Sequence, residues 1–225
     1  HSLPDVEADT LNIEGAISMM RGDYQAARDL YARSLALARS PAIRGKALQN
    51  LGGLAAQERN FDEGERLFAK SREAYRAAGD PRGEAVSLLN IGRLQQERGF
   101  AEVARGTLEA AVTAARVTGD LEMHAAALLN LGIALGALGL DSEAEERITT
   151  AYGQFTIADI PAARVRCLMQ LATLAARRDE TPGARICLRH AMDVATSADL
   201  PLEIQLIGEQ LTSLPDEEER RAVPL

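Results

Sequence analysis

The feature that most constrains the fold is an internal repeat with a period of 40 residues. Four segments align without gaps on a pattern of Leu, any residue, a carboxamide, an apolar residue and a small one. The small residues are Gly52, Gly92, Gly132 and Ala172, and sixteen residues further on stand Phe68, Leu108, Ile148 and Leu188. A first unit fits with a shorter link, at Gly15 and Tyr31. A fixed period of this length is typical of stacked supersecondary units.

Each unit is predicted to form two helices, because apolar residues recur at i, i+3, i+4 and i+7 and no strand pattern competes. The start signals are Pro41, Pro81, Pro161 and Pro201, which suit a first helical turn, and Ser40, Asp80 and Asp120, which we expect to cap one. The resulting all-α prediction places helix pairs near 5–39, 41–79, 81–118, 121–158 and 161–198, and a capping helix at 201–214. We expect one solenoid over residues 1–214 and a charged tail over 215–225.

The small residues have a mechanical role in this scheme. Two antiparallel helices approach closely only where the side chain at their crossing is small, and large residues one turn away then fill the flanking grooves. We therefore expect Gly52 to face Phe68, and Gly92 to face Leu108. Stacked pairs bury a continuous core, which a terminal helix covers.

The pattern resembles the tetratricopeptide repeat, whose signature places a Leu-Gly pair, a Tyr, an Ala, an aromatic residue and an Ala at set offsets. Tyr24 and Phe61 match its mid-repeat aromatic residue. A 40-residue period resembles the long subtype found in kinesin light chain and in helical sensor regions of bacterial transcription regulators. The resemblance implies a right-handed superhelical solenoid with a concave groove that holds peptides or partner proteins. Armadillo and HEAT solenoids have a similar period but lack this Gly-to-Ala pattern.

A recurring carboxamide marks the face that we expect to line the groove. It lies two residues before the small position, which is about 200° around the helix at ~100° per residue, and so points away from the partner helix. Its members are Asn50, Asn90, Asn130 and Gln170. Because a carboxamide both donates and accepts hydrogen bonds, such a row can hold the backbone of an extended peptide. Alternatively, these amides tie neighbouring repeats together or persist from duplication.

The same face carries basic and apolar residues. The basic ones are Lys46, Arg93, Arg166 and Arg177, and the acidic ones are Asp9 and Glu97. The excess of basic residues predicts a ligand with acidic groups, unless they merely solvate the helix face. The apolar ones, on or beside the row of amides, are Leu89, Leu129, Ile133 and Met169. The predicted peptide-binding set consists of the four amides, the four apolar residues, and Lys46, Arg93 and Arg166.

Composition excludes several functions. The net charge is −8 and aromatic residues make up 4% with no Trp, which argues against direct nucleic-acid binding. Two Cys suit a reducing compartment, and no signal peptide is recognisable, so we expect a cytoplasmic protein. The 18-residue uncharged run from Met123 to Leu140 is in phase with the repeat, which favours a buried helix over a membrane span. The chain starts without Met, so we expect a tag remnant or an excised fragment.

No motif for catalysis or for a cofactor or metal is present. His124 and His190 belong to different repeats, and Cys167 and Cys187 are expected to fill space rather than to form a redox pair. We therefore predict a protein-interaction scaffold and not an enzyme. The alternative is the sensor region of a multidomain bacterial transcription regulator that binds a peptide or a small effector, which the predominance of Arg over Lys favours. The acidic tail could bind a basic groove in its own molecule or in a second copy.

Overall fold

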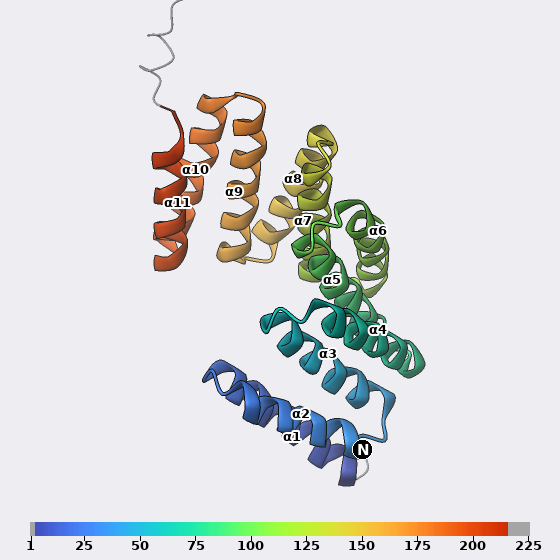
Figure 1. Ribbon diagram of the computed structural model, residues 1–225. Coiled ribbons are helices and arrows are strands. Elements are labelled where there is room, and N and C mark those ends of the chain that lie inside the picture. Colours follow the sequence, from blue (N-terminus) through green and yellow to red (C-terminus); the bar gives the residue numbers. More distant parts are fainter. Residues whose placement is uncertain (1–2, 216–225) are drawn as a thin grey trace, which may run out of the picture. The chain divides into compact units, whose positions relative to one another are not determined.

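A computed structural model describes residues 3–215, and throughout this range the regular structure is helical (Figure 1). The helices are α1 (Leu3–Met20), α2 (Tyr24–Leu37), α3 (Pro41–Gln57), α4 (Phe61–Ala78), α5 (Pro81–Glu97), α6 (Ala101–Thr118), α7 (Leu121–Ala137), α8 (Asp141–Ile157), α9 (Pro161–Arg177), α10 (Thr181–Ser197) and α11 (Pro201–Ser213). Their bounds lie within two residues of the predicted pairs. The all-helical class is thereby confirmed, whereas the single right-handed superhelix over residues 1–214 stays a prediction.

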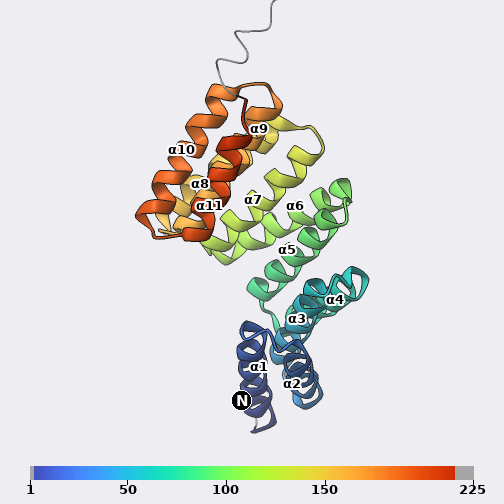
Figure 2. The ribbon, with the colours of Figure 1, turned by 60° about the vertical axis from the view of Figure 1, so that its left-hand side comes forward.

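The chain divides into two compact units, and each is built from packed neighbouring helices. Residues up to Met123 form the first unit, where the pairs α1–α2, α3–α4 and α5–α6 lie side by side in both ribbon views (Figure 2). Residues from His124 onward form the second, in which α9 packs on α8 and α10, and α11 packs on α10. Each element thus packs mainly on its neighbours in sequence, as expected of a repeat protein.

The helices begin mostly as the sequence predicts. Pro41, Pro81, Pro161 and Pro201 each stand in a first turn. Asp80 accepts a hydrogen bond from the Gly83 amide, and Asp120 from the Met123 amide, both at 3.0 Å. The prediction that Ser40 caps α3 through its side chain is wrong. Instead the backbone amides of Arg39 and Ser40 donate to Asp5 Oδ1 at 2.8 and 2.9 Å, so a buried carboxylate from α1 satisfies this turn.

The close helix crossings occur at the glycines of the repeat. A Cβ atom on Gly52 would lie 2.8 Å from the Phe68 ring, and one on Gly92 would lie 2.6 Å from Leu108. In the same way, a Cβ atom on Gly15 would lie 2.5 Å from the Tyr31 ring, and one on Gly132 would lie 2.5 Å from Ile148. Because real Cβ contacts are longer, a side chain at any of these four glycines would force the facing residue to shift. The predicted pairing of small and large residues is therefore confirmed.

Each unit has its own core. In the first, Ala27, Tyr31, Leu48, Leu51, Ala55 and Leu67 form one cluster, and Phe68, Ile91 and Leu94 form another. In the second, α9, α10 and α11 meet around Val165, Leu168, Leu188 and Ile207. Ile207 is fully buried, so α11 covers the apolar side of the last pair as predicted. None of the helices described is long and apolar enough to cross a membrane. The predicted interactions of the tail concern residues 215–225, of which 216–225 lie outside the described range.

Candidate functional site

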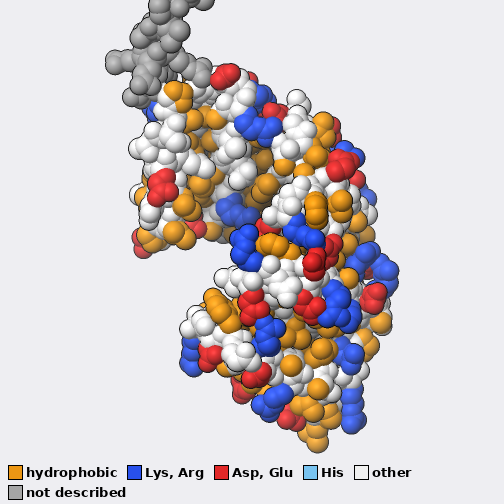
Figure 3. Space-filling view, viewed as in Figure 1, with side chains coloured by type: hydrophobic (Ala, Val, Ile, Leu, Met, Phe, Trp, Pro, Cys, Tyr) orange, Lys and Arg blue, Asp and Glu red, His pale blue; other side chains and the backbone are white. Residues whose placement is uncertain are grey.

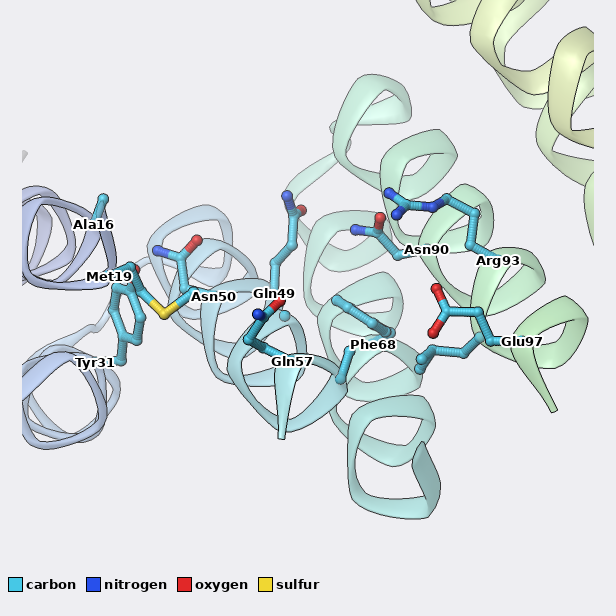
Figure 4. Close-up of a pocket in the computed structure, with 13 residues that line it drawn as sticks. Ala16, Met19, Tyr31, Gln49, Asn50, Gln57, Phe68, Asn90, Arg93 and Glu97 are labelled. Atoms are coloured by element: carbon cyan, nitrogen blue, oxygen red, sulfur yellow. The ribbon is translucent and has the colours of Figure 1, made fainter. Parts of the chain in front are cut away.

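The first unit contains a cavity of about 410 Å³ that five of its helices line. Its wall is made by Ala16 and Met19 of α1, Tyr31 of α2, Gln49, Asn50, Gly53, Ala56 and Gln57 of α3, Phe68 of α4, and Asn90, Arg93, Leu94 and Glu97 of α5. We call it the carboxamide cavity. Figure 4 shows Met19 and Asn50 at one end and Asn90, Arg93 and Glu97 at the other, with Gln49 and Gln57 between them.

The helical repeat explains why these residues meet. Asn50, Gly53 and Gln57 share one face of α3, because they are three and four residues apart. Forty residues further on, Asn90, Arg93 and Glu97 occupy the same positions of α5. Since α3 and α5 pack against each other, the two faces form one surface. The structure thus brings together Asn50, Asn90 and Arg93 of the residues singled out from sequence.

The cavity combines an apolar floor with polar groups above it. Tyr31, Phe68 and Leu94 are buried and supply the floor. Gln49, Asn50, Gln57 and Asn90 supply four carboxamides, each with donor and acceptor atoms. Within residues 3–215 the side chains of Asn90, Arg93 and Glu97 make no hydrogen bond or ion pair. These three side chains of α5 are therefore available to a bound molecule.

Two members of the predicted row of carboxamides, Asn50 and Asn130, have hydrogen-bond partners within the protein. Asn50 Nδ2 donates to Asn12 Oδ1 at 3.4 Å, which links α3 to α1 of the preceding repeat. Asn130 is 6% exposed, and its Nδ2 donates to the carbonyl of Ala126 at 2.7 Å, one turn earlier in α7. The Asn50 contact fits the alternative in which the amides tie neighbouring repeats together, whereas the Asn130 bond stays within one helix.

Two of the four basic residues of the predicted groove form ion pairs with carboxylates. Lys46 Nζ lies 2.6 Å from Asp9 Oδ1, and Arg177 Nη2 lies 3.0 Å from Asp141 Oδ1. Arg93 and Arg166 are exposed and make no such pair within residues 3–215. In the view of Figure 3, Lys and Arg are interspersed with Asp and Glu over the first unit.

The remaining predicted site residues do not line the carboxamide cavity. Leu89 is partly buried on α5, outside the cavity wall. In the second unit Leu129 is 1% exposed, and Met169 packs against the core of α9, α10 and α11. Ile133 and Gln170 are partly buried on α7 and α9. Of the predicted peptide-binding set, Asn50, Asn90 and Arg93 line the carboxamide cavity.

Sequence reasoning missed the lining residues Gln49, Gln57 and Met19, and the floor residues Tyr31 and Phe68. Gln57 had a detectable signal, because it is seven residues after Asn50 on the same helix face. Tyr31 and Phe68 were assigned to packing alone, yet their rings also reach the cavity. A residue that serves both the core and a cavity cannot be recognised from its helical position.

The thiols are poor nucleophiles. Burial raises the pKa of Cys167 to about 12, against a smaller opposing effect of Arg166. Burial, and then Glu145, also raises the pKa of Cys187. In the described part of the chain, no group of three or more His, Cys, Asp or Glu is placed to hold a metal ion.

The fold is that of a tetratricopeptide-like helical repeat protein. No family model matches the sequence, and no curated protein matches it either. Solved structures do match: a Rap protein complexed with Competence and Sporulation Factor has a TM-score of 0.78 at 16% identity, over 89% of this chain and 57% of that one. Aspartyl phosphate phosphatase F from Bacillus subtilis matches with a TM-score of 0.82 at 10% identity, over 96% of this chain and 57% of that one.

A kinesin light chain from Podosopora anserina with TPR-like repeats has a TM-score of 0.69 at 17% identity, over 89% of this chain and 100% of that one. The predicted resemblance to kinesin light chain repeats therefore holds for the fold. This chain spans less than two thirds of the length of the Rap proteins that it matches.

Proposed function

We propose that the protein is an interaction scaffold that binds an extended peptide segment of a partner protein in the carboxamide cavity. The observation that supports it best is the set of four carboxamides over an apolar floor in the first unit. Amides can satisfy the N–H and C=O groups of a peptide backbone, whereas the floor accepts an apolar side chain. A Rap protein of similar fold was solved in complex with Competence and Sporulation Factor, which supports a binding role for this fold.

Asn90 and Arg93 are the residues on which this proposal depends most. Both lack partners within residues 3–215, so a ligand can use their hydrogen-bonding capacity without breaking an internal contact. Arg93 favours an acidic group on the ligand, while Glu97 one turn away disfavours a second one nearby. Arg166, Met169 and Gln170 of α9 belong to the second unit, and their contact with a ligand stays a separate prediction. Asn130 is left out of the proposed contacts, because its side chain is buried and donates to the Ala126 carbonyl.

Gly53 provides a sharp test, because a Cβ atom there would meet nothing within 4 Å. Linear nine-residue peptides are selected from a displayed random library, and their affinities are measured by fluorescence anisotropy. Gly53→Leu should fill the cavity and abolish binding without unfolding the protein. Gly106→Leu is the matched control, since Gly106 of α6 also has open space around it and lies outside the cavity.

The same peptides test the polar contacts. Asn90→Ala should weaken binding by about 2-fold to 12-fold, because one hydrogen bond contributes about 0.5–1.5 kcal/mol. Arg93→Glu should weaken the binding of acidic peptides, and raised salt should weaken wild-type binding, since exposed charges are screened within ~10 Å at 0.1 M. If the selected peptides bind Gly53→Leu as well as wild type, the cavity is not the binding site.

The alternative is that the chain is the sensor region of a larger transcription regulator. The same cavity would then bind a peptide or a small effector, and this binding would control the other domains of the regulator. The partial coverage of the Rap proteins favours considering it. A DNA-binding or nucleotide-binding domain encoded beside this chain in its gene would support the sensor, and a gene without one would support the free-standing scaffold.

A further inference from the structure

The first unit contains a second cavity, of about 370 Å³, which α1, α3 and the end of α4 line together with the residue that caps α5. It shares no lining residue with the carboxamide cavity. Part of its wall is apolar, with Val6 and Ile13 of α1 and Ala42 and Ile43 of α3. The rest is polar and includes Tyr75 of α4, after which we call it the tyrosine cavity.

The hydroxyl of Tyr75 has no partner in the part of the chain that the structure describes. The side chain is 8% exposed and lines the cavity, and its oxygen makes no hydrogen bond within residues 3–215. Burial, and then the nearby charge of Asp80, raise the pKa of Tyr75 to about 12, so the hydroxyl keeps its proton at neutral pH. Because a polar group buried to this extent normally has a hydrogen-bond partner, the cavity has room and chemistry for one.

Packing explains the ring of Tyr75 but not its hydroxyl. A Cβ atom on Gly45 of α3 would lie 3.0 Å from this ring, and one on Gly83 of α5 would lie closer still. The ring is therefore held between α3 and α5, inside the first unit. Two repeats later Phe155 occupies the same position of α8, where it is 3% exposed without any hydroxyl. A phenylalanine at position 75 would thus meet the packing requirement, and the oxygen is left for another role.

The charges around the cavity favour a cation. Its charged lining residues are Asp5, Asp9, Asp80 and Lys46. Lys46 Nζ lies 2.6 Å from Asp9 Oδ1, so these two balance each other. Asp80 accepts the Gly83 amide at 3.0 Å but forms no ion pair within the described residues, and an amide does not neutralise its charge. A carboxylate thus lies beside the unpartnered hydroxyl.

We propose that the tyrosine cavity binds a primary ammonium group on a short aliphatic stem. An ammonium carries three donors, which suit the hydroxyl oxygen of Tyr75 and the carboxylate of Asp80, while the apolar wall suits the stem. The same chemical group occurs in a free alkylamine and in a lysine side chain of a peptide. This site goes beyond the proposed function of the carboxamide cavity and does not depend on it.

Titrations of the full chain, labelled with ¹⁵N and followed by NMR, test the site with three probes. n-Butylamine represents the free amine, lysine with its α-amino and carboxyl groups blocked represents the side chain, and 1-butanol is the uncharged control. Both ammonium probes should shift the amide signals of Gly45 and Gly83 saturably, and 1-butanol should not. Tighter binding of the blocked lysine would identify a lysine side chain as the source of the group, and tighter binding of n-butylamine a free amine.

Two conservative substitutions assign the contacts. Tyr75→Phe should weaken binding of the ammonium probes about 2-fold to 12-fold, as expected for one hydrogen bond, whereas Tyr24→Phe on the exposed start of α2 should not. Asp80→Asn keeps a capping side chain but removes the charge, and should weaken binding about tenfold or more.

Asp23→Asn makes the same change at the cap of α2 and should leave binding unchanged. Gly53→Leu should also leave it unchanged, which separates this site from the carboxamide cavity. The proposal is overturned if neither ammonium probe gives saturable shifts, if 1-butanol binds equally well, or if Tyr75→Phe and Asp80→Asn both bind the ammonium probes as wild type does.

Discussion

Gly52 and Gly53 are neighbours in α3, yet their surroundings are opposite. A Cβ atom on Gly52 would lie 2.8 Å from the Phe68 ring, which is itself buried, whereas one on Gly53 would meet nothing within 4 Å. Packing therefore requires one glycine, while the other carries the conformational cost of glycine in a helix without a packing benefit. At the scale of single residues, the fold and the cavity impose different requirements on adjacent positions.

Alanine at each position should therefore have opposite effects. Gly52→Ala should destabilise the protein by about 1–3 kcal/mol through overpacking. Gly53→Ala should stabilise it by about 0.5–1 kcal/mol, because alanine is the better helix former. Urea unfolding measures both, with Gly106→Ala as a second open position. A loss of stability in Gly53→Ala equal to that in Gly52→Ala would contradict this account.

At the scale of elements, ion pairs join one repeat to the next. Glu84 of α5 binds Arg72 and Arg76 of α4, and the hydrogen bond from Arg76 is the main cause that lowers the pKa of Glu84. A carboxyl whose pKa is lower in the folded state than in the unfolded state stabilises the fold at neutral pH. That contribution is lost as the pH falls through the folded pKa.

Replacing this carboxylate should thus have an effect that depends on pH. Glu84→Gln should reduce the free energy of unfolding at pH 7 by less than about 1 kcal/mol, because the arginines are substantially exposed. The difference from wild type should shrink below about pH 5 and vanish once Glu84 is protonated. Denaturant unfolding at several pH values, with Glu143→Gln as control, measures it. A difference that persists at low pH would show that the side chain acts through packing.

At the scale of the molecule, stability depends on covering the end of the second unit. Ile207 of α11 is fully buried among residues of α9 and α10, and Ile204, Leu211 and Leu214 pack around it. Fully burying one such side chain contributes roughly 1.5–3 kcal/mol. Arg185 of α10 also donates to the carbonyls of Leu214 and Pro215, at 3.2 and 3.0 Å. The helix and the residues that end it are therefore part of this core.

A chain that ends at Asp199 should melt several degrees earlier or aggregate, because it exposes the α9–α10 core. A chain that ends at Pro215 should melt as the full chain does, since it keeps α11 and both carbonyls. Hydrogen exchange should locate the added opening of the shorter chain in α9 and α10, and leave α3 and α4 protected. Equal loss in both truncations would assign a structural role to residues 216–225.

Local rules made the helices predictable. Periodicity, proline and glycine define helix bounds without long-range information, and the residue pairs Gly52–Phe68 and Gly92–Leu108 follow from a strict 40-residue register. The face of the site was also predictable, because Asn90 and Arg93 are one turn apart on the same helix. Ser40 shows where this reasoning fails. Its cap is replaced by Asp5, 35 residues away, and no local pattern indicates that contact.

The sequence alone therefore determined the helix pairs, the close crossings and the helix face that carries the amides, since these depend on intervals of a few residues or of one repeat. The tertiary structure decided which of those amides are available. Asn90 and Asn130 occupy the same position of the repeat, yet Asn90 lines a cavity and Asn130 is buried and bonds to Ala126. Burial depends on every neighbouring side chain, and the repeat makes those neighbours similar but not identical.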